Sequence, residues 1–315
     1  MHTRIIITTF AYQSKSNMRI VNNANITFRC LLSALLILLT FTFPLSAQML
    51  HTDRIYFNNP ENDSTRITQI LVSEIGQYPD ATPQQRILRL ARLFDGVKYQ
   101  AGTLERTPEI LTVNLDGFDC TTLVETAAAL AITASENRAS WRDFVYNLER
   151  IRYRGGRMTD YPSRLHYISE WSIDLRNRGI MREVTEDLAL AATDIKTLDY
   201  ITSHRDDYPA LADDETFARM KDAEVGYRSH RIPYIKSSNL KNAVLRDGDI
   251  IAFTTRTKGL DVSHVGIITL VGGKPFLFHA SSRAGKVTTE PVPLIDYLRK
   301  NRQISGFKIY RLINI

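Results

Sequence analysis

The chain has 315 residues, of which 43% are hydrophobic and 23% are charged, and its formal net charge is +6. This composition is typical of a globular protein and excludes a disordered tail, a collagen-like chain and a protein with many membrane spans. Two cysteines are too few for a disulfide scaffold. The length allows one larger domain or two small ones.

The first 47 residues have the pattern of a secretory signal peptide. They contain four cations and no acid, and an apolar run over residues 30–43 ends at Pro44-Leu45-Ser46-Ala47. A membrane-spanning helix needs about 20 apolar residues. We therefore predict a cleaved leader over residues 1–47, a periplasmic or otherwise exported protein, and no stable membrane insertion after cleavage. A retained membrane anchor is the alternative.

Cleavage near Ala47 would change both the charge and the cysteine content. It removes four of the 40 cations and none of the 34 acids, which leaves a net charge of about +2. No argument for nucleic-acid binding remains. Cys30 is lost with the leader, so Cys120 is alone and cannot form an internal disulfide. A lone thiol in an oxidising compartment is a liability unless it is buried or used.

In the mature chain, residues 48–315, predicted helices come before predicted strands. Apolar spacings of three and four predict helices after Thr82-Pro83, after Cys120 and over residues 141–151, with Thr82 and Asp119 as N-caps. Short β-rich runs at 249–253, 265–270 and 275–279 predict antiparallel strands, and 307–312 can add another. Residues 181–245 are mixed and polar, which predicts helix and loop. The pattern indicates a single α+β domain.

Three residues of this pattern could carry chemistry together. Cys120 begins a predicted helix, where the backbone N–H groups and the helix dipole favour a thiolate. His264 begins one predicted strand and His279 ends the next, so they could serve as the base and the third member of a triad. Taken singly, a buried cysteine is usually inert and such histidines are usually structural. A zinc site is disfavoured because Cys120 has no close ligand partner, and we expect no metal.

Several short motifs, in the same order over residues 95–285, resemble the NlpC-type cell-wall hydrolases. The motifs are Tyr99, Phe118-Asp119-Cys120, Gly248-Asp249-Ile250-Ile251, Ser263-His264-Val265-Gly266-Ile267 and Phe278-His279-Ala280. These relatives are papain-like cysteine enzymes that cut peptidoglycan peptides. The resemblance implies that Cys120 is the nucleophile, His264 the general base and His279 the orienting residue, without a cofactor. It also implies that the Cys120 N–H and the Tyr99 side chain donate to the oxyanion.

Thr121-Thr122 follows the cysteine, where the superfamily usually has Ser-Gly. The runs Gly102-Thr103-Leu104-Glu105, Phe118 to Glu125 and Asp160 to Tyr167 resemble the N-acetylmuramoyl-L-alanine amidase-like branch. That resemblance implies cleavage of the amide between N-acetylmuramic acid and L-alanine in peptidoglycan fragments, specifically anhydro-muropeptides, during wall turnover or recycling. The alternatives are an endopeptidase that cuts after D-glutamate and a catalytically silent wall-binding module.

The centre of the chain combines cations, hydrogen-bonding groups and flat apolar rings, which would suit the carboxylates, amides and sugar faces of a muropeptide. An ordinary buried stripe with Arg164 paired to an acid is the alternative, as is a purely structural N-cap role for Asp119. The residues predicted to bind substrate or the oxyanion are Tyr99, Asp119, Thr121, Tyr161, Ser163, Arg164, His166, Tyr167 and Ser263.

Overall fold

The computed structural model describes residues 54–188, 190–227 and 231–313, and the predicted leader lies outside this part of the chain. Within these ranges, no helix is both long and apolar enough to cross a membrane. The helices are α2 (Pro60–Gln77), α3 (Pro83–Ala91), α4 (Cys120–Ser135), α5 (Trp141–Arg152), α6 (Ile168–Asn177), α7 (Thr185–Leu188), α8 (Tyr200–Ser203), α9 (Asp214–Val225) and α10 (Leu294–Lys300). The strands are β1 (Ile55–Phe57), β2 (Leu111–Val113), β3 (Met181–Glu183), β4 (Ala191–Ile195), β5 (Arg231–Lys236), β6 (Ile250–Thr255), β7 (Val262–Val271), β8 (Lys274–Ser281), β9 (Lys286–Thr289) and β10 (Ile304–Leu312).

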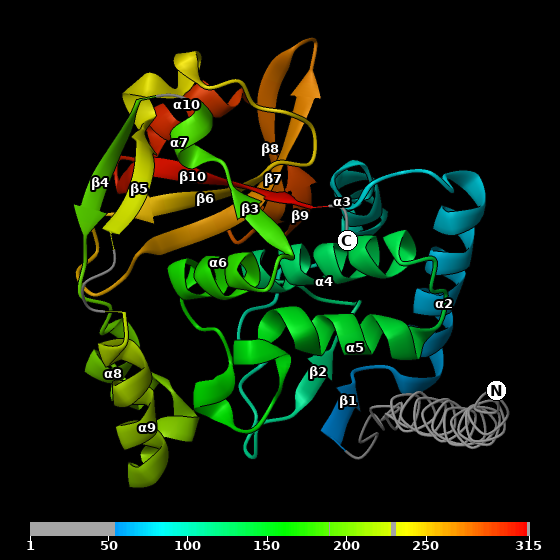
Figure 1. Cartoon of the computed structure of the whole chain (residues 1–315), viewed down its shortest axis with the longest axis horizontal. Coiled ribbons are helices and arrows are strands. Elements are labelled where there is room, and N and C mark those ends of the chain that lie inside the picture. The colour runs from blue at the N-terminus through cyan, green and yellow to red at the C-terminus, as the bar shows by residue number, and fades with distance from the viewer. Residues whose placement is uncertain (1–53, 189, 228–230, 314–315) are drawn as a thin grey trace, which may run out of the picture. The chain divides into compact units, whose positions relative to one another are not determined.

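Helix α4 is the centre of the helical layer. Every residue from Thr122 to Ala134 is buried, as expected for a helix that is covered on all sides. Many of these residues are alanines, so α3, α5 and the sheet can approach the α4 backbone closely. Figure 1 shows α4 between α5 and the strands. The N-caps predicted at Thr82 and Asp119 are both confirmed, each as part of a capping box.

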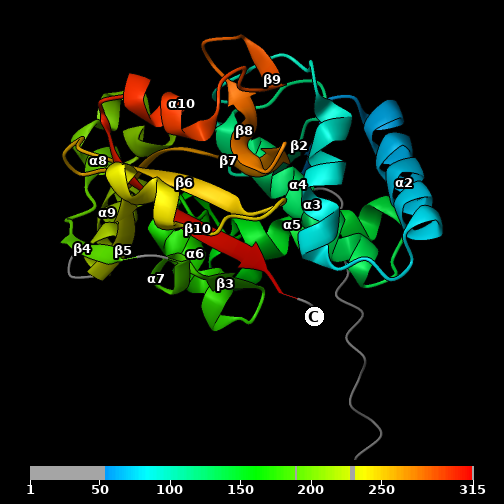
Figure 2. The same cartoon turned by 90° about the horizontal axis from the view of Figure 1, so that it is seen from above.

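The main sheet is antiparallel and has the strand order β4-β5-β10-β6-β7-β8-β9, with β3 paired to the other end of β10. Strands β1 and β2 form a separate parallel pair. Figure 1 and Figure 2 show α4 and α6 on one face of the sheet and α10 on the other. The α10 face is filled by an apolar cluster that includes Phe253, Ile268, Leu277, Leu294 and Leu298. The predicted α+β architecture is confirmed.

The prediction of helix and loop for residues 181–245 is partly wrong, because this segment also supplies β3, β4 and β5 to the main sheet. These strands are short, and β4 has no fully buried residue, so they lack the apolar alternation that identifies a strand in a sequence. Pairing across the sheet decides their conformation: Ile235 of β5 lies opposite both Phe307 of β10 and Ala191 of β4. Strand β10, the last in the chain, is therefore internal to the sheet.

Candidate active site

Cys120 is the first residue of α4 because its two neighbours end the extended segment before it. The Asp119 carboxylate accepts the Thr122 N–H at 2.8 Å, and the Thr122 hydroxyl accepts the Asp119 N–H at 3.0 Å. This reciprocal cap satisfies backbone donors that a helix start leaves unpaired. Thr122, a departure from the Ser-Gly pattern, thus has a structural role at the helix start.

The sulfur of Cys120 lies against strand β7. It accepts a hydrogen bond from the Val265 N–H, next to His264 in the chain, and the Thr121 hydroxyl is 3.9 Å away. The cysteine is partly exposed. Burial of the thiol, followed by the nearby Asp119 charge, raises the pKa of Cys120 to about 11. Backbone hydrogen bonds near the helix start lower this pKa, as expected, but burial and the Asp119 charge outweigh them, so the thiol is neutral at pH 7.

The two histidines and an acid form a continuous line of hydrogen bonds. Nε2 of His264 lies 2.6 Å from Nδ1 of His279, and Nε2 of His279 lies 3.1 Å from Oε1 of Glu290. The two imidazole rings are nearly perpendicular, and the ring of Tyr297 from α10 packs edge-on against His279. Strand pairing therefore brings His264, His279 and the start of α4 together.

The close approach of β7 to β8 requires the glycine that follows the His264-Val265 pair. A Cβ atom at Gly266 would lie 2.6 Å from Leu277 Cδ1 and 3.1 Å from His279 Cβ. A larger residue would therefore push His279 away from His264. This explains in physical terms why the histidine motif contains a glycine at this position.

Glu290 was missed by the sequence analysis. It lies just after β9, and its N–H donates to the Leu277 carbonyl at 2.8 Å, which fixes it beside β8. No local motif marks it, since its contact with His279 comes from sheet pairing.

Burial lowers the pKa of His264 to about 4 and that of His279 to about 3. Both rings are neutral at pH 7, in the form that can accept a proton.

Tyr99 is placed beside the cysteine by two backbone contacts. Its N–H donates to the Gly285 carbonyl at 2.8 Å, and the next residue donates to the Phe118 carbonyl at 2.9 Å. Burial and the nearby Cys120 charge raise the pKa of Tyr99. The phenol therefore remains protonated and keeps a hydrogen to donate.

A pocket of about 380 Å³ opens beside the two imidazoles. Ser263 is exposed at its wall, next to His264. The residues that line the pocket are Ser263, His264, His279, Ser281, Ser282, Arg283, Glu290, Tyr297, Lys300, Asn301, Arg302, Gln303 and Ile304.

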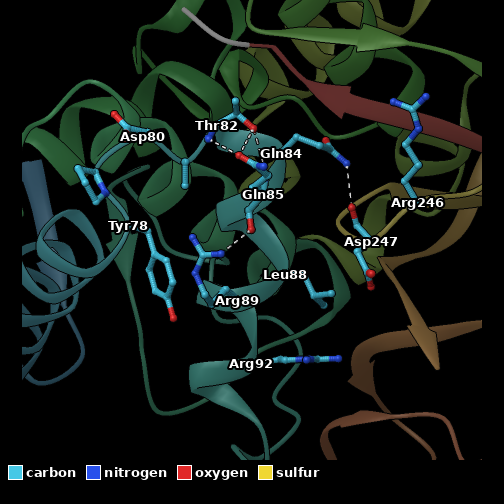
Figure 3. Close-up of a pocket in the computed structure, with 12 residues that line it drawn as sticks. Tyr78, Asp80, Thr82, Gln84, Gln85, Leu88, Arg89, Arg92, Arg246 and Asp247 are labelled. Carbon is cyan, nitrogen blue, oxygen red and sulfur yellow. Dashed lines mark hydrogen bonds between the residues drawn. The ribbon is translucent and has the colours of Figure 1, made fainter. Parts of the chain in front are cut away.

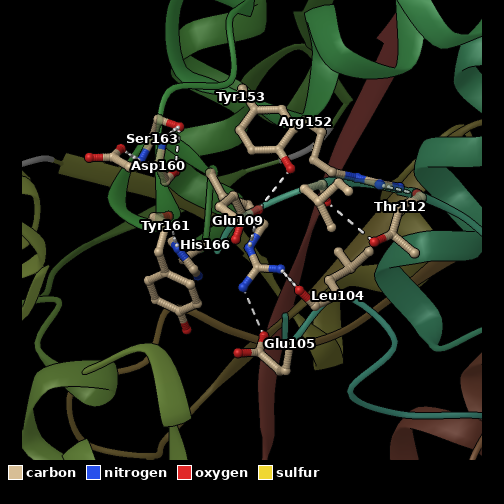
Figure 4. Close-up of polar contacts among 12 residues, drawn as sticks. Leu104, Glu105, Glu109, Thr112, Arg152, Tyr153, Asp160, Tyr161, Ser163 and His166 are labelled. Carbon is tan, nitrogen blue, oxygen red and sulfur yellow. Dashed lines mark hydrogen bonds and ion pairs between the residues drawn. The ribbon is translucent and has the colours of Figure 1, made fainter. Parts of the chain in front are cut away.

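Arg164 lies in a second polar region, where its charge is paired inside the protein. Figure 4 labels several residues of this region, among them Leu104, Glu105 and Tyr161. Its guanidinium donates to the Leu104 carbonyl and to the Glu105 carboxylate, both at 2.8 Å, and lies 3.8 Å from Glu109. It also lies over the ring of Tyr161, 4.8 Å from the centroid. Only 5% of the Arg164 side chain is exposed. These contacts are those of a buried structural ion pair, and its role in substrate binding stays a prediction.

Ser163 and Tyr167 also have partners within the protein. The Ser163 N–H donates to the Asp160 carboxylate at 3.1 Å in a short capped turn. The Tyr167 hydroxyl donates to Glu224 of α9 at 2.7 Å and accepts the Ile201 N–H at 3.0 Å. Tyr167 therefore anchors the α8–α9 segment to the rest of the domain.

His166 packs against Tyr161 with the rings tilted and 4.5 Å between their centroids, and its Nε2 lies 2.9 Å from the Tyr161 carbonyl oxygen. Burial and the nearby Arg164 cation lower the pKa of His166 to about 3, so its ring is neutral. Trp171 is buried against Tyr310 of β10. The structure thus separates this central region from the line of hydrogen bonds at Glu290.

A larger hollow of about 1000 Å³ lies at the start of α3, shown in Figure 3. It is lined by Tyr78, Thr82 and Arg89 on one side and by Arg246 and Asp247 on the other. No residue of the predicted site lines it. This hollow is the larger of the two, but the reactive side chains line the smaller pocket at the histidines.

No group of three or more His, Cys, Asp and Glu side chains suited to hold a metal ion occurs in the described ranges. The residues around Cys120 are instead arranged for proton transfer: a thiol, two neutral imidazoles and a carboxylate. A nucleophile, a base and an orienting chain are the parts of a covalent hydrolase site.

Several solved structures are similar to the chain over most of its length. The solved structures similar to the chain include an N-acetylmuramoyl-L-alanine amidase from Bacteroides uniformis, 37% identical, with a TM-score of 0.68 over 72% of this chain and 98% of that one. A Bacteroides fragilis protein that carries a xylanase name is 36% identical, with a TM-score of 0.67 over 71% of this chain and 99% of that one. A Legionella pneumophila protein, 23% identical with a TM-score of 0.60 over 81% of this chain and 97% of that one, shares the fold.

No curated protein matches the chain. A family model described as N-acetylmuramoyl-L-alanine amidase-like matches residues 89–306, which include Cys120, His264, His279 and Glu290. On this match, which covers most of the chain and the whole line of hydrogen bonds at its centre, the protein belongs to the N-acetylmuramoyl-L-alanine amidase-like family.

Proposed function

We propose that the protein is an exported cysteine amidase that hydrolyses the amide between N-acetylmuramic acid and L-alanine in peptidoglycan fragments. The observation that carries the proposal is the hydrogen-bonded line from His264 through His279 to Glu290, beside a Cys120 sulfur that accepts the N–H of Val265, the residue after His264. The family supports an amidase of peptidoglycan. The motif order supports a papain-like site of the NlpC type, and the basic, apolar leader pattern supports export.

One assignment of protons satisfies every hydrogen bond in the line. The Glu290 carboxylate accepts from Nε2–H of His279, and Nδ1 of His279 accepts from Nε2–H of His264. Nδ1 of His264 is then unprotonated and can accept the proton of the Cys120 thiol. Glu290 and His279 thus select the tautomer of His264 that can act as a base.

Catalysis then proceeds by two acyl transfers. His264 removes the thiol proton of Cys120 as the sulfur attacks the amide carbonyl carbon. The C–N bond breaks, the leaving amine takes the proton from the imidazolium, and a thioester remains. His264 next removes a proton from water, which attacks the thioester. The C–S bond breaks, the carboxylic acid leaves, and the sulfur regains its proton.

The negative oxygen formed in each step needs donors that are already in place. The Cys120 N–H lies in the first turn of α4, where backbone N–H groups have no partner within the helix. The Tyr99 phenol lies beside the thiol and stays protonated. We assign these two groups to the oxyanion hole. Thr121 and Ser263 lie at the edges of the site, as expected for substrate contacts.

Glycoside hydrolysis, which the name of the Bacteroides fragilis neighbour would suggest, finds little support here. That chemistry uses two carboxylates on opposite sides of the scissile bond. The pocket at the imidazoles contains a single carboxylate, Glu290, and it is bonded to His279. The thiol and the imidazoles favour acyl transfer instead.

Mass spectrometry of purified residues 48–315 with defined anhydro-muropeptides tests the proposal, beside a Cys120→Ala variant. We expect free anhydro-sugar and an intact stem peptide that begins with L-alanine from the wild type, and no product from the variant. A dipeptide product would move the cut to the bond after D-glutamate. No turnover by either protein would favour the silent wall-binding module, and product from Cys120→Ala would eliminate the cysteine mechanism.

A further inference from the structure

The pocket beside the imidazoles is lined by more cations than carboxylates. Its lining includes the cations Arg283, Lys300 and Arg302 and one carboxylate, Glu290, which is bonded to His279. The cations come from two separate segments: Arg283 from the turn between β8 and β9, and the other two from the end of α10 and the residues after it. The pocket therefore presents an excess of positive charge next to the base.

Arg283 is fixed across this pocket. One of its guanidinium nitrogens donates to Asn301 Oδ1 at 3.2 Å, and the Asn301 side chain in turn donates to the Tyr297 carbonyl at 2.7 Å. The Arg283 charge is close enough to His279 to lower the pKa of that imidazole further. Among the residues that line the pocket, no carboxylate pairs with Arg283, so its charge is available to an anionic ligand.

A helix C-terminus attracts cations, and this accounts in part for Lys300 and Arg299 in the last turn of α10. It does not account for Arg283, which comes from the hairpin and faces the same pocket. Arg299 provides a natural contrast, because it is exposed like the other cations but pairs with Asp296 and does not line the pocket.

The proposed reaction divides its substrate into two unequal halves. The acyl half is a sugar whose only carboxyl group is the one in the scissile amide. The leaving half is a peptide, and in it the α-carboxylate of D-glutamate, the second residue, is free. His264 must reach the leaving nitrogen to protonate it, so the peptide half extends from the cysteine past His264. The basic pocket lies beside His264 and Ser263.

Resting on the proposed function, we infer that the pocket formed by Arg283, Lys300 and Arg302 is the leaving-group subsite and binds the α-carboxylate of the second stem-peptide residue. The carboxylate would accept charge-assisted hydrogen bonds from guanidinium and ammonium donors. The pocket therefore gives the bound substrate a direction, with its peptide toward α10 and its sugar away from it. It also makes the enzyme selective for stem peptides in which this carboxylate is not amidated.

A pair of substrates that differ in one charge tests the inference. Both are 1,6-anhydro-N-acetylmuramoyl-L-alanyl-D-glutamate derivatives with a γ-methylamide in place of the next peptide bond. One has a free α-carboxylate and the other an α-carboxamide. We expect wild-type kcat/KM to be about tenfold higher for the carboxylate, since a hydrogen bond to a charged group is worth about that factor. Arg283→Gln should bring the ratio close to one.

The matched control is Arg299→Gln, which removes one cation from the same helix end outside the pocket and should keep the wild-type ratio. Equal kcat/KM values for the two substrates in the wild type would overturn the subsite while leaving the amidase function intact. A preserved ratio in an Arg283→Gln, Lys300→Gln double variant would do the same. If the wild type cleaves neither substrate, the proposed function itself fails.

Discussion

Two regions of this protein contain dense groups of reactive side chains, and their surroundings differ. In the first, the imidazoles of His264 and His279 line an open pocket, and the nearby Cys120 is partly exposed. In the second, Arg164 is buried and its donors are bonded to protein acceptors. Composition alone makes the second region resemble a binding site more closely. The comparison indicates that access to a ligand, rather than the number of polar groups, distinguishes the region that we propose as catalytic.

The largest expected effect comes from removing the base. His264→Ala should lower kcat/KM by at least about 10⁴-fold, because neither the attack nor the departure of the amine can then be assisted. Thermal unfolding should shift little, since this ring is partly exposed at the pocket. Steady-state kinetics with a muropeptide and a melting curve measure both. Retention of more than a tenth of the wild-type rate would exclude His264 as the base.

The opposite result is expected in the buried region. Arg164→Met should destabilise the fold by about 3–5 kcal/mol at pH 7, because Glu105 and Glu109 lose their buried cation. Burial already raises the pKa of Glu109. Without the cation that pKa rises further, so the loss should be smaller at pH 5 than at pH 7, because protonation of Glu109 is more favourable at the lower pH.

Urea unfolding at both pH values measures this loss, with the exposed Arg157→Met as the control. A stable Arg164→Met protein with a greatly raised KM would instead show that Arg164 binds substrate. That outcome would reverse the contrast between the two regions.

Glu290→Gln should have an intermediate effect, about a 10- to 100-fold lower kcat with a smaller change in KM, because it disturbs only the tautomer of the imidazoles. Asp296→Asn is the control, since it also removes a carboxylate near this pocket but one that pairs with Arg299. If the two variants are equally active, the hydrogen bond from His279 to Glu290 does not position the base.

The fall of wild-type kcat/KM at acidic pH provides a further test. Since the pKa of His264 is lowered to about 4, its neutral form persists well below the usual value of about 6.5. We expect kcat/KM to hold down to about pH 5 and to fall near pH 4. The unfolded protein binds protons on these histidines below about pH 6.5, so the free energy of unfolding declines as the pH falls from about 6.5 toward about 4. Fluorescence must therefore show that the protein stays folded. A fall of kcat/KM near pH 6.5 with folded protein would contradict the lowered pKa of His264.

The smallest effect is expected at the helix start. Asp119→Asn keeps a good N-cap but removes the charge that helps to raise the pKa of Cys120. Alkylation of the thiol by iodoacetamide at pH 9 should become about threefold to tenfold faster, because more thiolate is present. Mass spectrometry follows the adduct. An unchanged rate would mean that burial alone sets the thiol pKa.

The sequence by itself determined the local features of this protein. Thr82 and Asp119 cap helices because their side chains reach N–H groups within the next turn, and such contacts depend only on neighbouring residues. The apolar runs that become β6, β7 and β8 were visible for the same reason. The runs Gly102 to Glu105, Phe118 to Glu125 and Asp160 to Tyr167 were enough to indicate the amidase-like family.

Only the tertiary structure decided the rest. Strands β3 to β5 exist because partners in the sheet bind their backbones, and no pattern within residues 181–236 marks all of them. Glu290 joins His279 through sheet pairing, and the thiol pKa follows from burial that opposes the helix dipole. Arg164 pairs with acidic residues about 60 positions earlier in the sequence. Long-range contacts and desolvation are properties of the folded chain, so a sequence can name the reactive groups but cannot set their exposure or protonation.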